Sequence, residues 1–344
     1  MTNSDGFGSW ASLVLSGDTL FGTAKGGGTS GEGTIFAIKT DGTGFTNLHN
    51  FSAFYNNGAY EAPTNGDGAI PSGGLVLYSN TLIGTTASGG SFGSGTIFAI
   101  NTDGTGFRTL HSFAPALWTD GGTNSDGARP TADLLLSGNT LYGTTKYGGS
   151  FSAGGAVAGG TVFRVNTDGT AFTNLHSFSG SDGMFSESGL VLSDNNLYGT
   201  TWTSLGLAVG TIFAVTTDGT AFKVLHSFTA PDSNASTNTD GFNPFAGLVL
   251  SGNTLYGTAS GGGPSGNGTV FSLIIQPQLT LTPSASNLIL TWTTNAQGFA
   301  LQSTTNLGSS SAWSTNLPSP VVLNGQNVVT NPITAKQQFF RLSQ

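Results

Sequence analysis

The sequence of 344 residues contains no cysteine and carries little charge. The lack of cysteine excludes disulfides and thiolate metal sites. Only 9 residues are Lys or Arg, against 17 Asp or Glu, so the chain cannot form the basic stripe that nucleic-acid binding requires. No apolar run approaches the roughly 20 residues of a membrane-spanning helix. We therefore expect no nucleic-acid partner, no membrane span and no cofactor.

The N-terminus also lacks the pattern of a signal peptide, because Met1 leads directly into polar Thr2, Asn3 and Ser4. Two interpretations are open: a cytoplasmic protein, or an exported protein whose leader has been removed. The low charge, the few Lys residues and the many Ser, Thr, Asn and Gly residues favour the second. We expect an extracellular or cell-surface location.

Glycine and aromatic residues are abundant. The chain has 54 Gly, and its 24 Phe, 7 Tyr and 5 Trp are enough to bury a core, unlike the composition of a disordered chain. Short apolar runs separated by Gly, Asn and Asp predict β-strands joined by tight turns, and no segment shows helical periodicity. The composition therefore predicts an all-β protein.

Five copies of one pattern cover most of the chain. Each copy opens with Asp-Gly, and the opening Asp residues are 62, 59, 56 and 58 positions apart. An apolar run, a short Ser-Gly-Asn type of turn, a Leu-Tyr-Gly-Thr segment or close variant, and a Gly-Thr-Ile/Val-Phe segment follow in fixed order. Copies one to four end with Thr-Asp-Gly-Thr and Leu-His-Xaa-Phe. The opening residues are Asp5, Asp67, Asp126, Asp182 and Asp240.

Each copy thus contains about four short strand candidates, which predicts an antiparallel propeller blade. The alternative, a β-solenoid, usually has shorter coils of roughly 20–30 residues. We expect a five-bladed β-propeller over residues 1–276, followed by a small β-sandwich over residues 277–344.

The recurring segments resemble the tandem repeat of secreted Gloeobacter and Verrucomicrobia proteins. The resemblance rests on Leu-Tyr-Gly-Thr-Thr, Gly-Thr-Ile-Phe, Thr-Asp-Gly-Thr and Leu-His-Ser-Phe, and it covers roughly residues 5–274. It implies an exported bacterial surface protein and assigns no chemistry. A variable C-terminal anchor is frequent in the family, but this chain ends at Phe340–Gln344 without an apolar anchor helix or a basic tail.

The fifth copy stops early. It has no Thr-Asp-Gly-Thr and no Leu-His-Xaa-Phe segment after Val270–Leu273, so the fifth blade is one strand short. An open strand edge promotes association. Three outcomes are open: a three-stranded blade, a strand from residues 278–282, or a strand donated by another molecule in a head-to-tail assembly.

Residues 277–344 do not continue the repeat. Strand candidates alternate with turn residues, and Asn324-Gly325 is a good hairpin turn. The segments LTWTT, FALQSTTNL, AWS and FFRL resemble a fibronectin-III-like module, which implies a spacer, an adhesive unit or a sorting signal. The expected strands are 279–282, 288–293, 299–303, 321–323, 328–329 and 339–342.

The four histidines all occur in Leu-His-Xaa-Phe, one per blade. Blade geometry would separate them too far to share a metal ion, so we expect no metal site. Instead we expect each His to bond a neighbouring backbone group or the opening Asp of the next repeat. The structural network predicted in this way comprises His49, His111, His176, His226, Asp67, Asp126, Asp182 and Asp240.

The predicted ligand site lies on the long loops between blades and within blades. Variable loops on a rigid scaffold commonly carry function, and exposed aromatic side chains suit sugar rings or protein partners. The alternative is that these side chains cover blade edges or plug the disc. The candidates are Tyr55, Tyr60, Trp118, Tyr147, Phe151 and Trp202.

No catalytic pattern stands out. A glycosidase needs two carboxylates that face each other across a cleft, and nine of the Asp residues already occupy repeat openings or Asp-Gly turns. We therefore expect a non-enzymatic structural or binding module, including self-assembly into a fibre. The alternative is a carbohydrate-binding lectin on the long-loop face. The expected partner is a second copy of the chain, or a surface glycan or protein.

Overall fold

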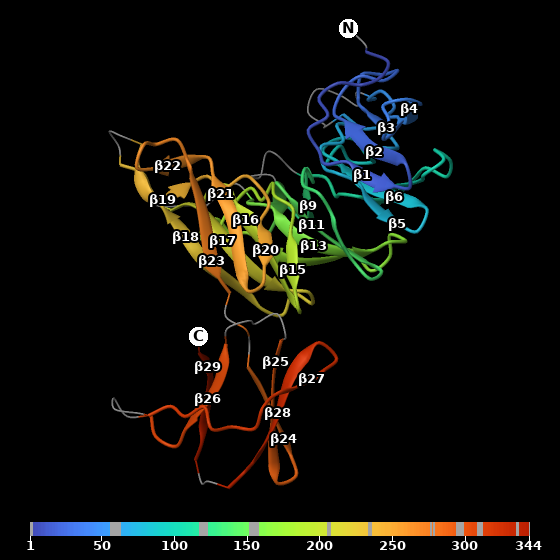
Figure 1. Ribbon diagram of the computed structural model, residues 1–344. Coiled ribbons are helices and arrows are strands. Elements are labelled where there is room, and N and C mark those ends of the chain that lie inside the picture. The colour runs from blue at the N-terminus through green and yellow to red at the C-terminus, as the bar shows by residue number, and fades with distance from the viewer. Residues whose placement is uncertain are drawn as a thin grey trace. The chain divides into compact units, whose positions relative to one another are not determined.

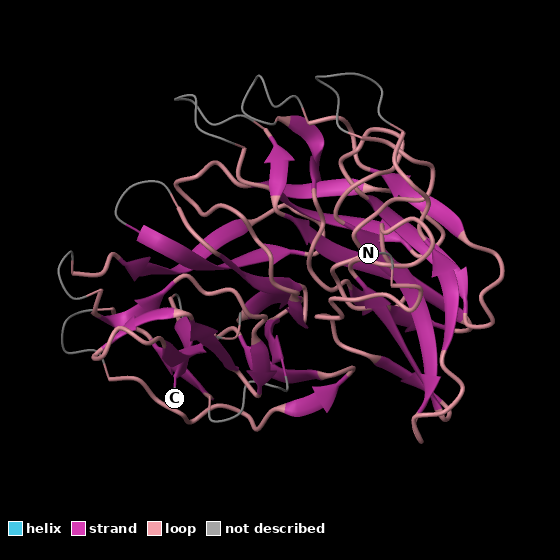
Figure 2. Ribbon diagram, turned by 90° about the horizontal axis from the view of Figure 1, so that it is seen from above, coloured by secondary structure: helices cyan, strands magenta, loops and turns pink. Residues whose placement is uncertain are grey.

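The computed structural model describes residues 3–55, 63–116, 123–150, 158–204, 208–232, 236–275, 277, 279–293, 299–307, 312–334 and 337–343. All regular elements among these residues are β-strands, as expected, and no helix is present in them (Figure 2). The chain divides into two compact units. The first comprises Met1–Leu248 and Gly257–Phe271, and the second comprises Val249–Tyr256 and Ser272–Gln344.

Copies one to four of the repeat each form a four-stranded antiparallel sheet whose strands pair in chain order (Figure 1). The first two sheets contain β1 (Val14–Ser16), β2 (Thr19–Ala24), β3 (Thr34–Lys39) and β4 (Thr46–Asn50), then β5 (Val76–Tyr78), β6 (Thr81–Thr86), β7 (Thr96–Asn101) and β8 (Arg108–Ser112). The next two contain β10 (Leu135–Ser137), β11 (Thr140–Thr145), β13 (Thr161–Asn166) and β14 (Thr173–Ser177), then β15 (Val191–Ser193), β16 (Asn196–Thr201), β17 (Ala208–Thr216) and β18 (Phe222–Thr229).

Among the described residues the fifth sheet has three strands, one fewer than the other four copies. Residues 280–282 do not complete it, because they pair with a strand of the C-terminal segment. The extra two-stranded sheets that the opening Asp-Gly segments form in copies three and five were not expected. The fifth sheet contains β20 (Val249–Ser251), β21 (Thr254–Ala259) and β23 (Thr269–Ile274). In the two extra sheets, β9 (Asn124–Ala128) pairs with β12 (Tyr147–Gly149), and β19 (Asn238–Phe242) pairs with β22 (Gly261–Gly263).

The C-terminal residues form one four-stranded and one two-stranded antiparallel sheet around Leu290, Trp292, Leu301 and Val329. All six expected strands are present, within four residues at each end. Their order is β24 (Thr280–Ser284), β25 (Asn287–Thr293), β28 (Gln326–Pro332) and β27 (Val321–Leu323), with β26 (Ala300–Thr304) beside β29 (Phe339–Ser343).

The turns of each repeat follow from a few residues. Ser16 pairs with Thr19 across a two-residue hairpin loop, in which Gly17 has φ of +60°. The Asp-Gly turn is longer than a two-residue hairpin, because six residues separate β3 from β4. Its Asp41 accepts hydrogen bonds from the backbone N–H and the hydroxyl of Thr43, at 2.9 and 2.7 Å. Both bonds lower the pKa of the Asp41 carboxyl, and the bond from the Thr43 hydroxyl has the larger effect.

The core lies between consecutive sheets rather than inside one sheet. Phe21 and Ile35 on one face of the first sheet pack with Leu75 and Phe98 on the facing side of the second. Two further clusters join the second sheet to the third and the third to the fourth through the same repeat positions. Alternation along each strand therefore gives every internal sheet two apolar faces.

The same repeat position provides a matched test of this packing. Val162 in β13 is fully buried, whereas Val270 in β23 is 82% exposed. We expect Val162→Ala to lower the free energy of unfolding by about 2 kcal/mol, because it removes two buried methyl groups and leaves a cavity. Val270→Ala should change it by less than about 0.5 kcal/mol in dilute solution. Denaturant unfolding measures both values, and equal losses would contradict this packing.

Candidate binding cavity

The first group of predicted residues, the histidines and opening aspartates, lies at the joints between repeats. His49 Nε2 lies 3.0 Å from Asp67 Oδ2, and the pair His111 and Asp126 has a distance of 2.9 Å. The corresponding distances are 2.8 Å for His176–Asp182 and 3.0 Å for His226–Asp240. Each histidine therefore contacts the opening Asp of the next repeat.

Three of these histidines, His49, His111 and His176, also stack on a phenylalanine of the following copy. The His49 ring lies parallel to Phe107 at a centroid distance of 3.9 Å, and His176 lies parallel to Phe222 at 3.6 Å. The same Asp accepts a backbone N–H just after the histidine strand, as Asp67 does from Ser52 at 3.0 Å. The described residues contain no group of three His, Cys, Asp or Glu that could hold a metal ion.

Hydrogen bonds lower the pKa of two of these aspartates, Asp67 and Asp182. Burial raises the pKa of the Asp182 carboxyl, but hydrogen bonds from His176 and Ser179 outweigh it and hold the pKa below its ordinary value. The same balance, with His49 and Ser52 as donors, lowers the pKa of Asp67. Both carboxylates are therefore bound more strongly in the charged form than in the neutral form.

The aromatic candidates do not form one site. Tyr55 is 72% exposed and lies in the loop after the first sheet. Tyr147 and Trp202 lie in a cluster with Phe185, whose ring centroid is 5.3 Å from that of Tyr147 and 6.2 Å from that of Trp202. The other three candidates, Tyr60, Trp118 and Phe151, lie outside the described residues.

This cluster lies behind one wall of a cavity of about 430 Å³ within the first unit, and its three rings do not line the cavity themselves. Trp202 packs on Phe245, with centroids 5.1 Å apart, and Phe245 lines the cavity. Lys146 Nζ lies 2.8 Å from Glu187 Oε1 and 5.8 Å from the centroid of the Trp202 ring. A cavity of this size lies within the range of small-molecule sites.

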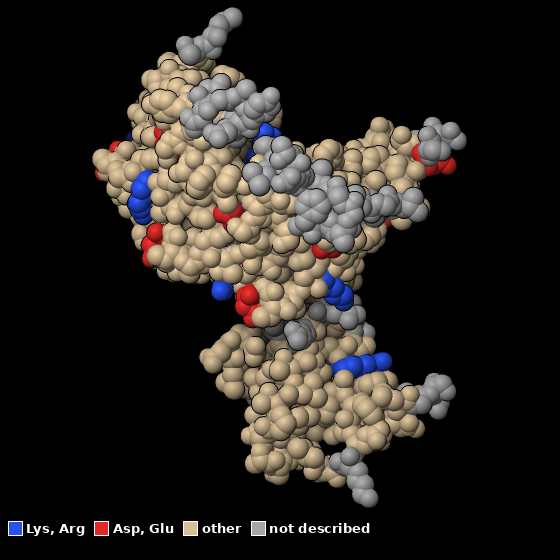
Figure 3. Space-filling view, turned by 180° about the vertical axis from the view of Figure 1, so that it is seen from behind, with Lys and Arg blue, Asp and Glu red and all other residues tan. Residues whose placement is uncertain are grey.

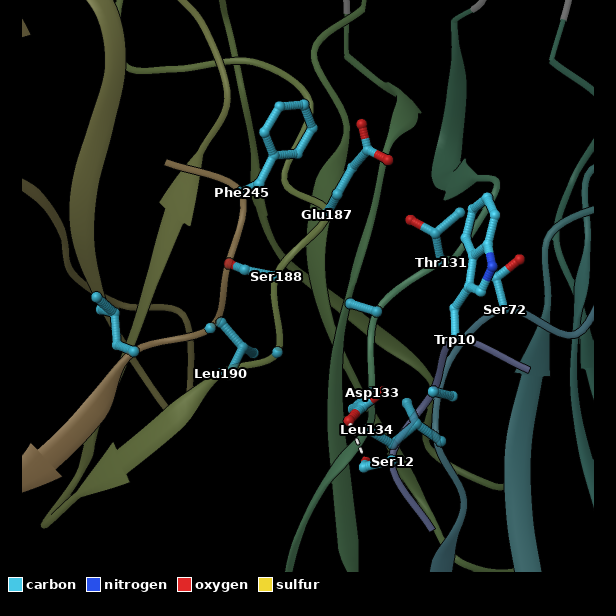
Figure 4. Close-up of a pocket in the computed structure, with 15 residues that line it drawn as sticks. Trp10, Ser12, Ser72, Thr131, Asp133, Leu134, Glu187, Ser188, Leu190 and Phe245 are labelled. Atoms are coloured by element: carbon cyan, nitrogen blue, oxygen red, sulfur yellow. Dashed lines mark hydrogen bonds between the residues drawn. The ribbon is translucent and has the colours of Figure 1, made fainter. Parts of the chain in front are cut away.

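One repeat position supplies a side chain to this cavity from all five copies. This lining position comes three residues before the leucine that immediately precedes the first strand of each of the five sheets. Its residue differs in every copy, whereas the leucine is constant. The five residues at the lining position are Trp10, Ser72, Thr131, Glu187 and Phe245. Figure 4 shows Trp10 and Phe245 on opposite sides of the cavity, with Glu187 between them.

Asp133 holds the base of the cavity together. Its Oδ2 accepts the Ser12 hydroxyl at 2.9 Å (Figure 4). Its Oδ1 accepts the Gly74 N–H at 2.5 Å. The three residues occupy the same repeat position, two after the lining position. Asp133 thus ties copies one and two to copy three.

Sequence analysis missed the lining position because it followed loop length and aromatic content. The signal was present in the alignment of the copies, where one position varies between Trp, Ser, Thr, Glu and Phe beside constant neighbours. A variable position in an otherwise uniform repeat indicates a surface that is not needed for packing.

Comparison with known families identifies the repeat. The model of the Gloeobacter/Verrucomicrobia repeat matches residues 1–154, 61–271 and 150–307. The chain belongs to the Gloeobacter/Verrucomicrobia repeat family. This confirms the resemblance that the recurring segments indicated. None of the curated proteins compared with the chain matches it.

Several solved structures are distantly similar to this repeat protein. A nidogen/laminin complex matches with 16% identity and a TM-score of 0.43, covering 70% of this chain and 68% of the other. The extracellular domain of the one-component system BT4673 from B. thetaiotaomicron has 12% identity and a TM-score of 0.44, with 88% and 34% covered. The GH74 enzyme of Niastella koreensis has 13% identity and a TM-score of 0.44, with 89% and 43% covered. The chain thus spans less than half of the last two.

Two further properties of the described residues bear on possible partners: the length of their elements and the charge of their surface. Among the described residues no helix is long and apolar enough to cross a membrane. Figure 3 shows charged side chains scattered over one face of the molecule, with no continuous basic area. The cavity to which all five copies contribute is a defined candidate for ligand binding in the described part of the chain.

The His–Asp pairs predict an acid-dependent stability. A carboxyl whose pKa is lowered on folding stabilises the protein above its unfolded pKa, near 3.8, and this contribution disappears as the pH falls through the folded value. We expect Asp182→Asn to lower the free energy of unfolding at pH 7 by about 1–3 kcal/mol, because hydrogen bonds to a charged group are lost. The difference from wild type should shrink below pH 4.

A matched control is available at the same repeat position. Asp5 opens the first copy and is exposed, and no histidine strand precedes it in this chain. Asp5→Asn should leave the pH dependence of the melting temperature unchanged. If Asp182→Asn behaves in the same way, the His–Asp pair does not stabilise the fold.

Proposed function

We propose that this protein is a non-catalytic, extracellular binding module that holds a carbohydrate in the cavity lined by Trp10, Glu187 and Phe245. In this proposal the five sheets are the blades of a five-bladed propeller that stays open between its first and fifth blades, whose outer faces are exposed. The C-terminal sheets are a fibronectin-III-like spacer. The supporting observation is that one repeat position contributes a different side chain to a single cavity from each of the five copies.

The chemistry of the lining favours a hydroxyl-rich ligand. Trp10 is 81% exposed and Phe245 is 44% exposed, so both offer apolar ring faces for the C–H groups of a sugar. Ser72 adds a hydroxyl and Glu187 a carboxylate oxygen to the lining, and both can exchange hydrogen bonds with sugar hydroxyls, whereas the Thr131 hydroxyl is buried. Lys146 offsets the charge of Glu187, which favours a neutral ligand.

The same geometry supports a binding role over catalysis. Both oxygens of Asp133 already accept hydrogen bonds, from Ser12 and Gly74. Glu187 is paired with Lys146. A glycosidase needs one carboxyl that donates a proton and another that acts as nucleophile or base, and two carboxylates with fixed partners fit neither role well.

The proposal predicts saccharide binding that depends on the two exposed rings of the cavity. A glycan array with the full chain should identify at least one binding saccharide, and calorimetry should measure its affinity. We expect Trp10→Ala and Phe245→Ala each to weaken binding by about tenfold or more, the loss of one well-placed aromatic contact. Both side chains are exposed, so the melting temperature should change little.

Tyr55→Ala is the matched control, because Tyr55 is an exposed aromatic residue outside the cavity lining. It should bind like the wild type. Trp202→Ala should weaken binding indirectly, since Trp202 supports Phe245 from behind. The absence of binding to any glycan, or an equal loss in Tyr55→Ala, would overturn the proposal.

A further inference from the structure

The joints between consecutive sheets use two complementary faces. The forward face of a sheet, which packs on the next copy, presents Ile35 or Ile97 from its third strand. The backward face, which packs on the preceding copy, presents the leucine at the start of the sheet, such as Leu75 or Leu134. Three such joints form separate apolar clusters within the chain.

The backward face of the first sheet has no partner among the described residues. Leu13 is 48% exposed, whereas the equivalent leucines of the other four copies are only 5–6% exposed. Leu15 and Phe45 on the same sheet are 55% and 43% exposed. Three large apolar side chains whose equivalents in the other copies are buried or half-buried therefore lie on the surface.

The forward face of the fifth sheet is exposed in the same way. Val270 is 82% exposed, although its equivalents in copies one to four are almost completely buried. Those equivalents are Ile35, Ile97, Val162 and Ile212, with exposed fractions of 0%, 0%, 0% and 1%. The two exposed faces are thus the two halves of the joint that the chain forms internally.

We propose that a second copy of this chain places the backward face of its first sheet on the forward face of the fifth sheet. This head-to-tail contact continues a joint whose two faces are already shown to fit each other inside the chain. A contact of this kind uses different surfaces on the two molecules, so it can add further copies and extend into a filament. The contact is independent of any ligand in the cavity.

The joint between copies is weaker than the internal joints. The fifth sheet has no fourth strand, so it lacks the leucine and the final phenylalanine that Leu48 and Phe51 supply to the first joint. It also has no histidine on which Phe45 of the incoming copy could stack, as Phe107 stacks on His49. Association should therefore depend on concentration, with single chains predominating in dilute solution.

Sedimentation velocity of the full chain over a range of concentrations tests this contact, with electron microscopy of the concentrated sample. We expect species heavier than one chain of 34.8 kDa at high concentration. Leu15→Glu on the backward face and Val270→Glu on the forward face should each abolish them, because a charge would then be buried in the joint. Both positions are exposed in the single chain, so circular dichroism and melting should stay unchanged.

Mixing the two variants distinguishes a head-to-tail contact from other arrangements. Each variant keeps one intact face, so an equimolar mixture should form a pair of twice the mass of one chain and nothing larger. Tyr55→Glu, a change at an exposed site outside both faces, should assemble like the wild type.

Three results would overturn the proposal. The first is a single chain at every concentration. Closure of the first sheet on the fifth within one molecule would give this result. The second is assembly that persists in both variants. The third is a mixture of the two variants that forms no pair.

Discussion

Burial of two apolar faces on every internal sheet is the constraint on which the rest of this structure depends. A single four-stranded sheet of about twenty residues cannot form a core, because each of its faces needs a cover. The repeat meets this need by placing the forward face of one copy on the backward face of the next, with Ile35, Leu75 and Phe98 in the first joint. The His–Asp pairs then tie the last strand of each of the first four sheets to the opening segment of the next copy.

This arrangement divides the repeat positions into two classes. Positions in the joints vary little, since Ile, Val, Leu and Phe must interlock at close to crystal density. The lining position contacts the cavity instead, and it holds five different residues in five copies. A scaffold of this kind can change its ligand through single substitutions at that position without disturbing the core.

The sequence predicts the scaffold well and the site poorly, for physical reasons. Strand alternation, Gly-containing turns and the Leu-His-Xaa-Phe segments are local signals, so the strands and the partners of His111 and His176 followed from the repeat. The cavity depends on side chains such as Trp10 and Phe245, which are 235 residues apart and meet only after all five sheets are in place. The exposed state of Val270 likewise depends on which sheets have neighbours, not on its local sequence.

Asp133 has a consequence for the dynamics of the repeats. In a linear repeat array each unit contacts only its neighbours, and the terminal units can open alone. The bonds from Asp133 to Ser12 and Gly74 join the first copy to the third as well as the second to the third. Opening of the first copy therefore breaks a contact beyond its nearest neighbour, which couples the edge of the array to its middle.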